Sequence, residues 1–542
     1  MTARAPLLSV EGLSVDFELW GRNVTAVRDV SFQLATGEIL GIVGESGSGK
    51  SVTCRAILGL LPPTAKVGGR VMFGGTDLCA LSPADIAEVR GRQISMIFQN
   101  PSSHLDPLMT IGGQIAEAPR LQLGKSRAEA RRDAIRMLEE VRIRDPEYRV
   151  DSYPHELSGG MKQRAMIASA ISCEPRLLLA DEPTTALDVT VQARILELLK
   201  DLNRRRSLSV ILISHDLGVI SAVCDRVIVM RHGKVVESGP TEEIIQRPKE
   251  PYTRLLIDSQ PSRRTRQRQV QEKHDEAPIL SVRNLTVEFS ADTSLVDLLR
   301  GQSARRVRAV NDVSFGVAAG ESFAIVGESG SGKSTIARAI ARLNQPKSGS
   351  IRFDGQEAAA LSGDELRAYR RGVQMVFQSP YDSLNPRMRV GDAIEEPLIR
   401  HGLACGGEAT DRVRQLLEMV ELPYDLRNRK PHELSGGQCQ RVGIARALAL
   451  SPRLLIADEI TSALDVTIQA QILDLLRRLQ QSQGLTMIYI SHDLAVVRAF
   501  CDRVAVLSGG EIVEIGDVGN VLTAPAHEYT RTLIAAAPSL GT

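Results

Sequence analysis

The chain contains one long pattern written twice, and this repeat limits its fold more than any other feature. Three blocks recur, and each second copy lies 277 positions after the first. A period of that length is a whole domain in tandem rather than the short unit of a solenoid. The sequence therefore predicts two similar domains. The paired blocks are PHELSGG at 154–160 and 431–437, LLLADEPTTALDVTVQA at 177–193 with LLIADEITSALDVTIQA at 454–470, and ISHDL at 213–217 and 490–494.

The segment between the repeats, PSRRTRQRQVQEKHDEAP (261–278), is polar and charged and has prolines at or near its ends. This composition is typical of a flexible linker. We expect the first domain at 1–260 and the second at 279–542. The arginines of the linker are expected to be solvated, with contact to a membrane surface or a partner as the alternative.

Each half alternates short apolar runs with helical patterns. ILGIVG (39–44) and FAIVG (323–327) stop at glycine, as buried parallel strands do, and VQARILELLKDLNRR (191–205) has helical periodicity. The alternation predicts an α/β fold with a sheet covered on both faces. A mostly helical insert is expected at about 105–175, including the amphipathic segment 127–141.

Composition excludes several classes of protein. Lysine plus arginine is 66 and aspartate plus glutamate is 65, so no charge excess predicts binding to nucleic acid. No apolar run approaches the roughly 18–20 residues that cross a bilayer, and MTARAPLLSVEG lacks the apolar core of a signal peptide. We therefore expect a cytosolic chain. The 7 cysteines form no C-x-x-C pair, so nothing in their spacing supports a zinc site or an iron–sulfur cluster.

Both halves carry GESGSGKS, at 44–51 and at 327–334, which matches the phosphate loop G-x-x-x-x-G-K-[ST]. The glycines let backbone N–H groups face phosphate oxygens, and a helix beginning inside GKS adds the positive end of its dipole. The lysine would neutralise the β- and γ-phosphates, and the serine hydroxyl can ligate Mg²⁺. The expected nucleotide-binding residues are Gly44, Ser46, Gly47, Gly49, Lys50, Ser51 and Val52, and in the second half Gly327, Ser329, Gly330, Gly332, Lys333, Ser334 and Thr335.

Acidic pairs end an apolar strand in each half. Asp181 and Asp458 are placed to complete a Mg²⁺ site beside the phosphate loop. Glu182 and Glu459, which follow directly, can polarise the attacking water as general bases. Such a pair can also simply cap a strand or a helix, but the adjacent phosphate loop favours the catalytic interpretation.

Two further polar residues end strands in both repeats. The amides of Gln99 and Gln378 can reach the metal or the water without adding charge. The imidazoles of His215 and His492 can hydrogen-bond a γ-phosphate. A single histidine of this kind would usually be structural, and its recurrence at the same place in each repeat favours a catalytic role.

One series of motifs resembles the ATP-binding cassette of ABC transporters, over nearly all of both halves. In order along the chain, the motifs are GESGSGKS, the glutamine after SMIF, LSGG, ADEPTTALD and ISHDL. The resemblance implies two tandem P-loop cassettes, each with a RecA-like α/β core, an antiparallel β subdomain and a helical subdomain. It implies that they face each other head to tail, so that each ATP lies between the phosphate loop of one half and the LSGG turn of the other.

The resemblance assigns residues to two shared sites. It also implies an adenine-stacking aromatic, for which Phe17 and Phe289 are the candidates and Trp20 a weaker one, unless they only pack in the core. Met161 and Ile460 depart from the family pattern without removing a charge or metal ligand, so we expect hydrolysis at both sites, with unequal rates as an option. The first site would combine Lys50, Ser51, Gln99, Asp181, Glu182 and His215 with Ser435, Gly436, Gly437 and Gln438; the second would combine Lys333, Ser334, Gln378, Asp458, Glu459 and His492 with Ser158, Gly159, Gly160 and Met161; the metal ligands would be Ser51, Gln99, Asp181, Ser334, Gln378 and Asp458.

The endings PYTRLLIDSQP (251–261) and EYTRTLIAAAP (528–538), together with SLNPRM, resemble the dipeptide/oligopeptide/nickel branch of bacterial importers. This implies an ATPase held at the cytoplasmic face of the bacterial cell membrane by two integral-membrane permease subunits, which segments 101–110 and 380–389 would contact, and an extracytoplasmic substrate-binding protein. The implied cargo is peptide, with glutathione or nickel as alternatives. Tails of this branch can hold an iron–sulfur cluster through cysteines, and neither tail here has one, so no cluster is expected.

Other twin-cassette proteins fit the sequence less well. A translation factor would carry a longer charged helical arm between its domains, and a DNA-repair ATPase would carry cysteine-rich modules or long coiled coils. Sugar importers differ in their tails, and a fused exporter needs membrane spans. The sequence therefore favours the importer ATPase.

Overall fold

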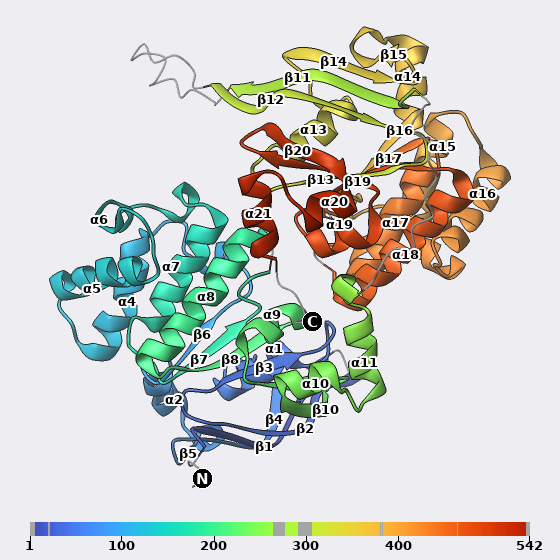
Figure 1. Ribbon diagram of the computed structural model, residues 1–542. Helices are drawn as coiled ribbons and strands as arrows, with labels where there is room; N and C mark the ends of the chain where they lie inside the picture. The colour runs from blue at the N-terminus through green and yellow to red at the C-terminus, as the bar shows by residue number, and fades with distance from the viewer. Residues whose placement is uncertain are drawn as a thin grey trace.

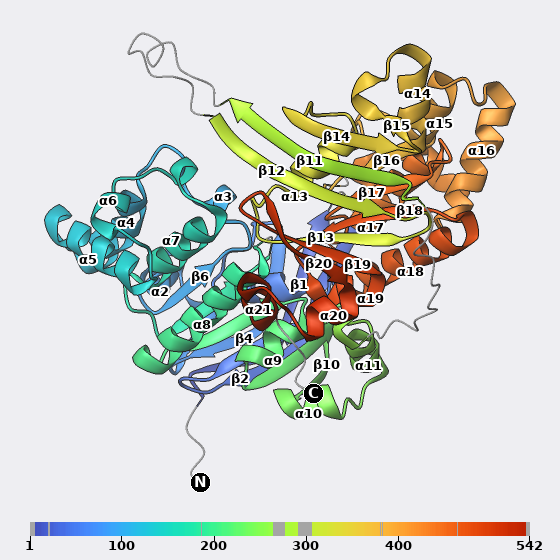
Figure 2. The same cartoon turned by 45° about the horizontal axis from the view of Figure 1, so that its top comes forward.

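The computed structural model describes residues 6–19, 22–185, 187–263, 277–290, 306–379, 381, 383–462 and 464–537. Two halves of the same architecture lie side by side and meet along one seam (Figures 1 and 2). Most of the predicted linker, residues 264–276, lies outside the described residues, so 1–260 and 279–542 remain proposed domain boundaries. The start of that linker, Pro261–Arg263, is a 3₁₀ turn that contacts helix Leu494–Phe500 of the second half.

The first half runs from the antiparallel strands at the N-terminus to helix α11. Its strands are β1 (Leu8–Leu19), β2 (Arg22–Leu34), β3 (Ile39–Val43), β4 (Ala65–Phe73), β5 (Thr76–Asp77), β6 (Ile94–Ile97), β7 (Leu177–Asp181), β8 (Ser209–Ser214), β9 (Arg226–Arg231) and β10 (Lys234–Pro240). Its helices are α1 (Lys50–Ile57), α2 (Pro83–Val89), α3 (Pro101–His104), α4 (Ile111–Leu123), α5 (Arg127–Glu140), α6 (Pro146–Arg149), α7 (Gly159–Ile171), α8 (Val189–Arg206), α9 (Leu217–Val223), α10 (Thr241–Gln246) and α11 (Pro251–Asp258).

The second half repeats this order. Its strands are β11 (Leu280–Ser290), β12 (Arg306–Val317), β13 (Ser322–Val326), β14 (Ser348–Phe353), β15 (Gln356–Glu357), β16 (Val373–Val376), β17 (Leu454–Asp458), β18 (Thr486–Ser491), β19 (Arg503–Ser508) and β20 (Glu511–Asp517). Its helices are α13 (Lys333–Ile340), α14 (Gly363–Gly372), α15 (Val390–Arg400), α16 (Gly406–Met419), α17 (Gly436–Leu448), α18 (Val466–Gln483), α19 (Leu494–Phe500), α20 (Val518–Thr523) and α21 (Glu528–Ala535).

A six-stranded sheet forms the centre of each half, in the order β10-β9-β3-β8-β7-β6 in the first and β20-β19-β13-β18-β17-β16 in the second. All strand pairs in it are parallel except the antiparallel edge pairs β9–β10 and β19–β20. Alternate residues of one strand enter different cores: Leu178 and Ala180 face the helical side, and Leu177 and Leu179 face the antiparallel side. The continuous apolar runs in the sequence follow from this burial on both faces, as predicted.

The predicted α/β fold class is confirmed, and so are the expected subdomains. A four-stranded antiparallel sheet, β2-β1-β4-β5 or β12-β11-β14-β15, lies beside each central sheet. Helices α4, α5 and α7, or α15, α16 and α17, form a helical layer at the other side (Figure 1). The helix predicted at 127–141 is α5, which begins at a capping box formed by Ser126 and Glu129.

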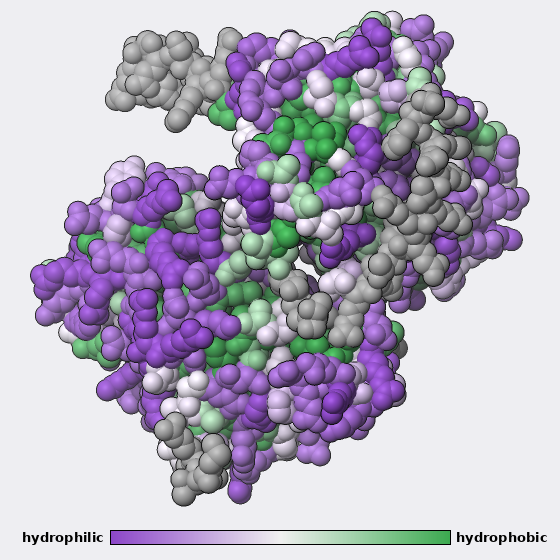
Figure 3. Space-filling view, viewed as in Figure 1, coloured by the Kyte–Doolittle hydropathy of each residue, from purple (hydrophilic) through white to green (hydrophobic). Residues whose placement is uncertain are grey.

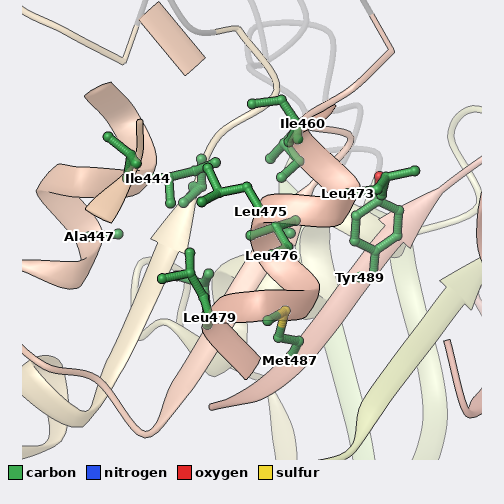
Figure 4. Close-up of a cluster of buried hydrophobic side chains, with 14 of the residues drawn as sticks. Ile444, Ala447, Ile460, Leu473, Leu475, Leu476, Leu479, Met487 and Tyr489 are labelled. Atoms are coloured by element: carbon green, nitrogen blue, oxygen red, sulfur yellow. The ribbon is translucent and has the colours of Figure 1, made fainter. Parts of the chain in front are cut away.

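The core of the second half shows how one departure from the family pattern is accommodated. Ile460, which stands where the first half has Pro183, is only 1% exposed and packs near α18 (Figure 4). Leu473, Leu476 and Tyr489 belong to the same cluster. The isoleucine therefore fills core volume rather than changing the site chemistry.

The halves touch through their C-terminal helices. Helix α11 of the first half packs on α18 of the second, and α21 of the second packs on α8 of the first. Apolar residues are visible where α21 meets the first half, whereas the outer face of α4–α6 is mostly hydrophilic (Figure 3). Among the described residues, no helix is long and apolar enough to span a bilayer.

Candidate nucleotide-binding sites

The phosphate loop of each half joins a buried strand to a helix that begins at its lysine. In the first half, β3 ends at Val43 and α1 begins at Lys50, after Gly49 with φ 98°. A side chain at Gly44 is excluded because its Cβ would lie 2.2 Å from the Met230 carbonyl oxygen. The second loop is built in the same way, with Gly332 at φ 105° and Gly327 against the Leu507 carbonyl. These glycines are therefore required by the turn itself.

The two loop lysines are buried and folded onto their own loops. Lys50 Nζ donates to the carbonyl oxygens of Gly44 (2.7 Å) and Glu45 (2.9 Å). Lys333 Nζ donates to those of Gly327 (2.9 Å) and Glu328 (2.8 Å). Burial lowers the pKa of each lysine, and nearby carboxylates oppose that shift. An anion bound in the loop would supply the negative partner that a buried ammonium requires.

Hydroxyl and carboxylate oxygens lie together behind each loop. Ser51 Oγ donates to Asp181 Oδ1 at 2.7 Å, and Ser334 Oγ donates to Asp458 Oδ1 at 3.0 Å. Burial raises the pKa of both aspartates. Oxygen donors of this kind suit Mg²⁺. A buried hydroxyl without a partner, Ser48 or Ser331, stands in each loop, so the residues present fit a phosphate group with Mg²⁺.

The predicted bases lie beside the predicted glutamine and histidine. Glu182 Oε2 accepts hydrogen bonds from Gln99 Nε2 (2.9 Å) and Thr185 Oγ1 (2.9 Å), and His215 Nδ1 lies 3.3 Å from it. Burial opposes the charge, but the hydrogen bond and charge of His215, aided by Thr185, lower the pKa of Glu182 to about 2. Glu182 is therefore an ionised carboxylate at neutral pH.

The second half differs by one hydrogen bond. Glu459 accepts from Gln378 Nε2 (2.7 Å), and His492 Nδ1 lies 3.5 Å from its carboxylate. Ser462, which stands where the first half has Thr185, donates instead to the Glu459 backbone carbonyl (2.9 Å). Sequence reasoning did not select Thr185 or Ser462. The change from threonine to serine is nevertheless one of the few differences between the blocks LLLADEPTTALDVTVQA and LLIADEITSALDVTIQA.

Both glutamates also have a strained backbone, with φ 46° at Glu182 and 49° at Glu459. Left-handed backbone is costly for a residue with a side chain and is commonly found at functional sites. The N–H of each glutamate donates to the end of the neighbouring strand, at Ile213 (3.1 Å) or Ile490 (3.0 Å). The sheet therefore holds each carboxylate in this orientation.

The histidine–glutamate pairs predict a pH-dependent stability of the nucleotide-free chain. Burial opposes the charge of His215, but Glu182 raises the pKa of His215 above its ordinary value, and Glu459 does the same for His492. Stability from a raised pKa is fully present below the ordinary pKa and is lost as pH rises through the raised one. We expect His215→Gln/His492→Gln to lower the Tm more at about pH 6 than at about pH 9.

Calorimetry at both pH values measures this difference. His432→Gln, on an exposed turn, is the matched control, and its effect on the Tm should be small at both pH values. An equal loss of Tm at both pH values in the double variant would show that the pairs are not ionic.

The LSGG turns open helices α7 and α17. Ser158 and Ser435 are the N-caps and accept hydrogen bonds from Met161 N (3.4 Å) and Gln438 N (3.3 Å). Gln438 completes a capping box with Ser435 through its side-chain amide. Met161 stands at the equivalent position after Ser158 and has no amide, so it cannot form this box. Gly160 and Gly437 are close to α8 and α18, because a Cβ there would lie 2.6 Å from Val191 or Ile468. Both serines are exposed, as is Gly159, whereas Gly160 and the first glycine of the second turn, Gly436, are half-buried.

The structure joins the halves at the phosphate loop through Asp465 and Thr467, which sequence reasoning did not select. Ser46 N donates to Asp465 Oδ2 (3.0 Å), and Thr467 Oγ1 donates to Glu45 Oε1 (2.7 Å). In the part of the chain that the structure describes, no hydrogen bond joins an LSGG turn to the opposite loop. ALDVT is repeated in both halves, and this repeat was the sequence signal from which Asp465 and Thr467 could have been selected.

The opposite pair of segments has a similar placement. Asp188 of the first half, equivalent to Asp465, is among the carboxylates whose charge acts on Lys333. Between the halves lies a cavity of about 130 Å³ that both ISHDL histidines line. Each phosphate loop thus faces a segment of the other half, namely the one that follows strand β17 or strand β7.

The aromatic candidates lie at the ends of their strands. Phe17 on β1 is half-buried and lies opposite Val24, and Phe289 on β11 is 44% exposed and lies opposite Val307. Trp20 lies outside the described residues. Stacking on adenine stays a prediction for all three.

Two family comparisons define the class. A family model described as "ABC transporter" matches residues 27–185 and 310–462. A second, described as "Oligopeptide/dipeptide transporter, C-terminal region", matches residues 236–285 and 513–542. The chain therefore belongs to the ABC transporter family and carries its ATP-binding domain twice. The predicted resemblance, the two-cassette fold and the ATPase class are confirmed.

Curated relatives resemble nearly the whole chain. It is 46% identical to the "Glutathione import ATP-binding protein GsiA" of Shigella boydii serotype 4 (strain Sb227) and to that of Escherichia coli (strain K12), over 98% of this chain and 89% of each relative. Among solved structures, one cassette is similar to the "Dimeric structure of a post-hydrolysis state of the ATP-binding cassette MJ0796 bound to ADP and Pi", with TM-score 0.40, 34% identity and coverage of 44% of this chain and 98% of that one.

Proposed function

We propose that this chain is the ATP-hydrolysing subunit of an importer, and that it couples two ATP sites shared between its halves to uptake of short peptides through separate permease subunits. The observation that carries the proposal is the contact of Asp465 with Ser46 N, because it brings the second half to the phosphate loop of the first. A loop that already meets the other half is suited to a nucleotide that both halves bind.

Each site would use its residues in separate roles. The loop N–H groups and Lys50 or Lys333 bind the phosphates, and Ser51 with Asp181, or Ser334 with Asp458, would hold Mg²⁺ together with the glutamine amide. Mg²⁺, when bound there, would neutralise part of the charge of the phosphate oxygens.

The remaining side chains would act on the water and on the γ-phosphate. Glu182 and Glu459 are ionised carboxylates that can accept a proton from the attacking water. In the structure the glutamine amide and the histidine ring lie against each of these carboxylates. We propose that the γ-phosphate draws His215 and His492 away and frees the base.

Closure would bring the LSGG turns over the opposite nucleotide. Ser158 and Ser435 are exposed and stand at helix N-termini, where backbone N–H groups and the helix dipole attract anions. ATP would therefore draw the halves together, and loss of phosphate would release them.

A groove beside Gln378 supports contact with a permease. It measures about 350 Å³ and lies between the central sheet and the helical layer of the second half, lined in part by Phe377, Arg400 and Arg446. In the first half, Leu108 of segment 101–110 is 85% exposed. Such surfaces suit short helices of two integral-membrane partners, which would hold the chain at the cytoplasmic face of the cell membrane.

Short peptides are the proposed cargo, and glutathione is the first to test. The matched C-terminal region and the glutathione importers at 46% identity both support this choice. Glutathione is itself a tripeptide. An extracytoplasmic binding protein would deliver it, and nickel is the alternative cargo.

Reconstitution tests the proposal. The full chain is placed in proteoliposomes with two candidate permease subunits and a candidate binding protein, and labelled glutathione, a dipeptide mixture or Ni²⁺ is offered. We expect uptake of glutathione or dipeptide that requires ATP and Mg²⁺ and stops when Mg²⁺ is chelated. ATP-driven uptake of Ni²⁺ alone, or co-sedimentation of the chain with ribosomes instead of permeases, would contradict the proposal.

A further inference from the structure

We infer that Tyr252 and Tyr529 are positioning residues that hold the phosphate loops from the C-terminal region of each half. The inference rests on the proposed ATP sites. Tyr252 lies on α11 and Tyr529 on α21, both inside the matched oligopeptide/dipeptide region. Both tyrosines therefore lie in the regions that match the oligopeptide/dipeptide transporter model.

The contact is made twice, once in each half. The hydroxyl of Tyr252 accepts a hydrogen bond from Glu45 N, and that of Tyr529 accepts one from Glu328 N, both at 3.1 Å. Glu45 and Glu328 follow the first glycine of each phosphate loop. Tyr252 is 4% exposed, and its burial raises the pKa of Tyr252 to about 12, which keeps the hydroxyl neutral.

The surroundings hold the Tyr252 ring in place. In the first half, the Arg231 guanidinium stacks on the Tyr252 ring, with its carbon 4.6 Å from the ring centroid. The same two helices reach across the seam, α11 to α18 and α21 to α8 (Figure 1). Each C-terminal helix therefore touches its own phosphate loop and the helix that follows Asp465 or Asp188 in the other half.

This arrangement can orient the loop for a nucleotide. Glu45 N is engaged by tyrosine, and the next N–H, at Ser46, is engaged by Asp465. Because the Glu45 N–H is held by the tyrosine, the loop has fewer conformations available before ATP binds. The loop therefore loses less conformational entropy when ATP binds. Each hydroxyl is bonded to the loop backbone and not to the base Glu182 or Glu459, so we expect its effect to fall on ATP affinity and not on the chemical step.

Removal of the hydroxyls tests this in the full chain. In Tyr252→Phe/Tyr529→Phe the rings and their packing remain. We expect the KM for ATP to rise about five-fold, the factor that one ordinary net hydrogen bond provides, with kcat within about two-fold of wild type. Tyr369→Phe is the matched control, because the Tyr369 hydroxyl is buried and donates to the Ile340 carbonyl (2.6 Å), at the end of α13 opposite to the phosphate loop. It should lose similar thermal stability and keep the wild-type KM.

An unchanged KM in the double variant would overturn the inference, and so would an equal rise of KM in the control. A fall in kcat at constant KM would also overturn it, since it would place the hydroxyls in the chemistry. If wild type itself hydrolysed no ATP, the proposed function would fail instead, so the two failures are distinguishable.

Discussion

Glu182→Gln/Glu459→Gln is expected to bind ATP as wild type does and to hydrolyse it at least about 100-fold more slowly. The carboxylates are ionised and lie beside the Mg²⁺ ligands proposed at Asp181 and Asp458. Glutamine keeps an oxygen that can accept the bonds from Gln99 and Gln378 but cannot take a proton from water. The variant should therefore remain closed with ATP inside.

Steady-state hydrolysis and filter-bound ATP measure the two effects separately. Glu421→Gln is the matched control, because the Glu421 carboxylate pairs with Arg441 at 2.7 Å in the helical layer and has no part in the site. Hydrolysis by the double variant within a few-fold of wild type would remove both glutamates from the role of general base.

The single variants add a comparison between the halves. Thr185 holds the Glu182 carboxylate, whereas Ser462 bonds to the backbone of Glu459. The two glutamates are thus oriented by different sets of hydrogen bonds. Unequal residual rates in Glu182→Gln and Glu459→Gln would agree with this difference.

Much of the fold could be predicted from sequence because its signals are local. The constant repeat offset predicted two halves, and apolar runs ending in glycine or aspartate predicted β3 and β7. The segment 127–141 has both a helical period and a capping box, and it is helix α5. Motif residues that follow these strands necessarily meet at the same edge of the sheet.

The missed residues act through contacts that no local pattern records. Asp465 reaches Ser46 across 419 positions, and Tyr252 reaches Glu45 across 207. Neither residue type predicts its partner, since an aspartate before a helix is an ordinary cap and a tyrosine in an amphipathic helix is an ordinary core residue. Thr185 was missed for a different reason: only the side-chain geometry separates it from Ser462.

The shared-site arrangement makes the second large prediction. Lys50 and Ser435 belong to one proposed site, and Lys333 and Ser158 belong to the other. Lys50→Ala/Ser435→Glu damages one site twice and leaves the other whole. Lys50→Ala/Ser158→Glu makes the same kinds of change but damages both sites. Both serines are exposed, so a glutamate has room at either turn; each change removes an equivalent N-cap, and the added charge repels phosphate.

The count of ATP molecules trapped per chain, made in the Glu182→Gln/Glu459→Gln background, tests the central claim most directly. The parent should trap about two, Lys50→Ala/Ser435→Glu about one, and Lys50→Ala/Ser158→Glu close to none. The reverse order of the last two variants would mean that each half binds its nucleotide alone, and it would contradict the account.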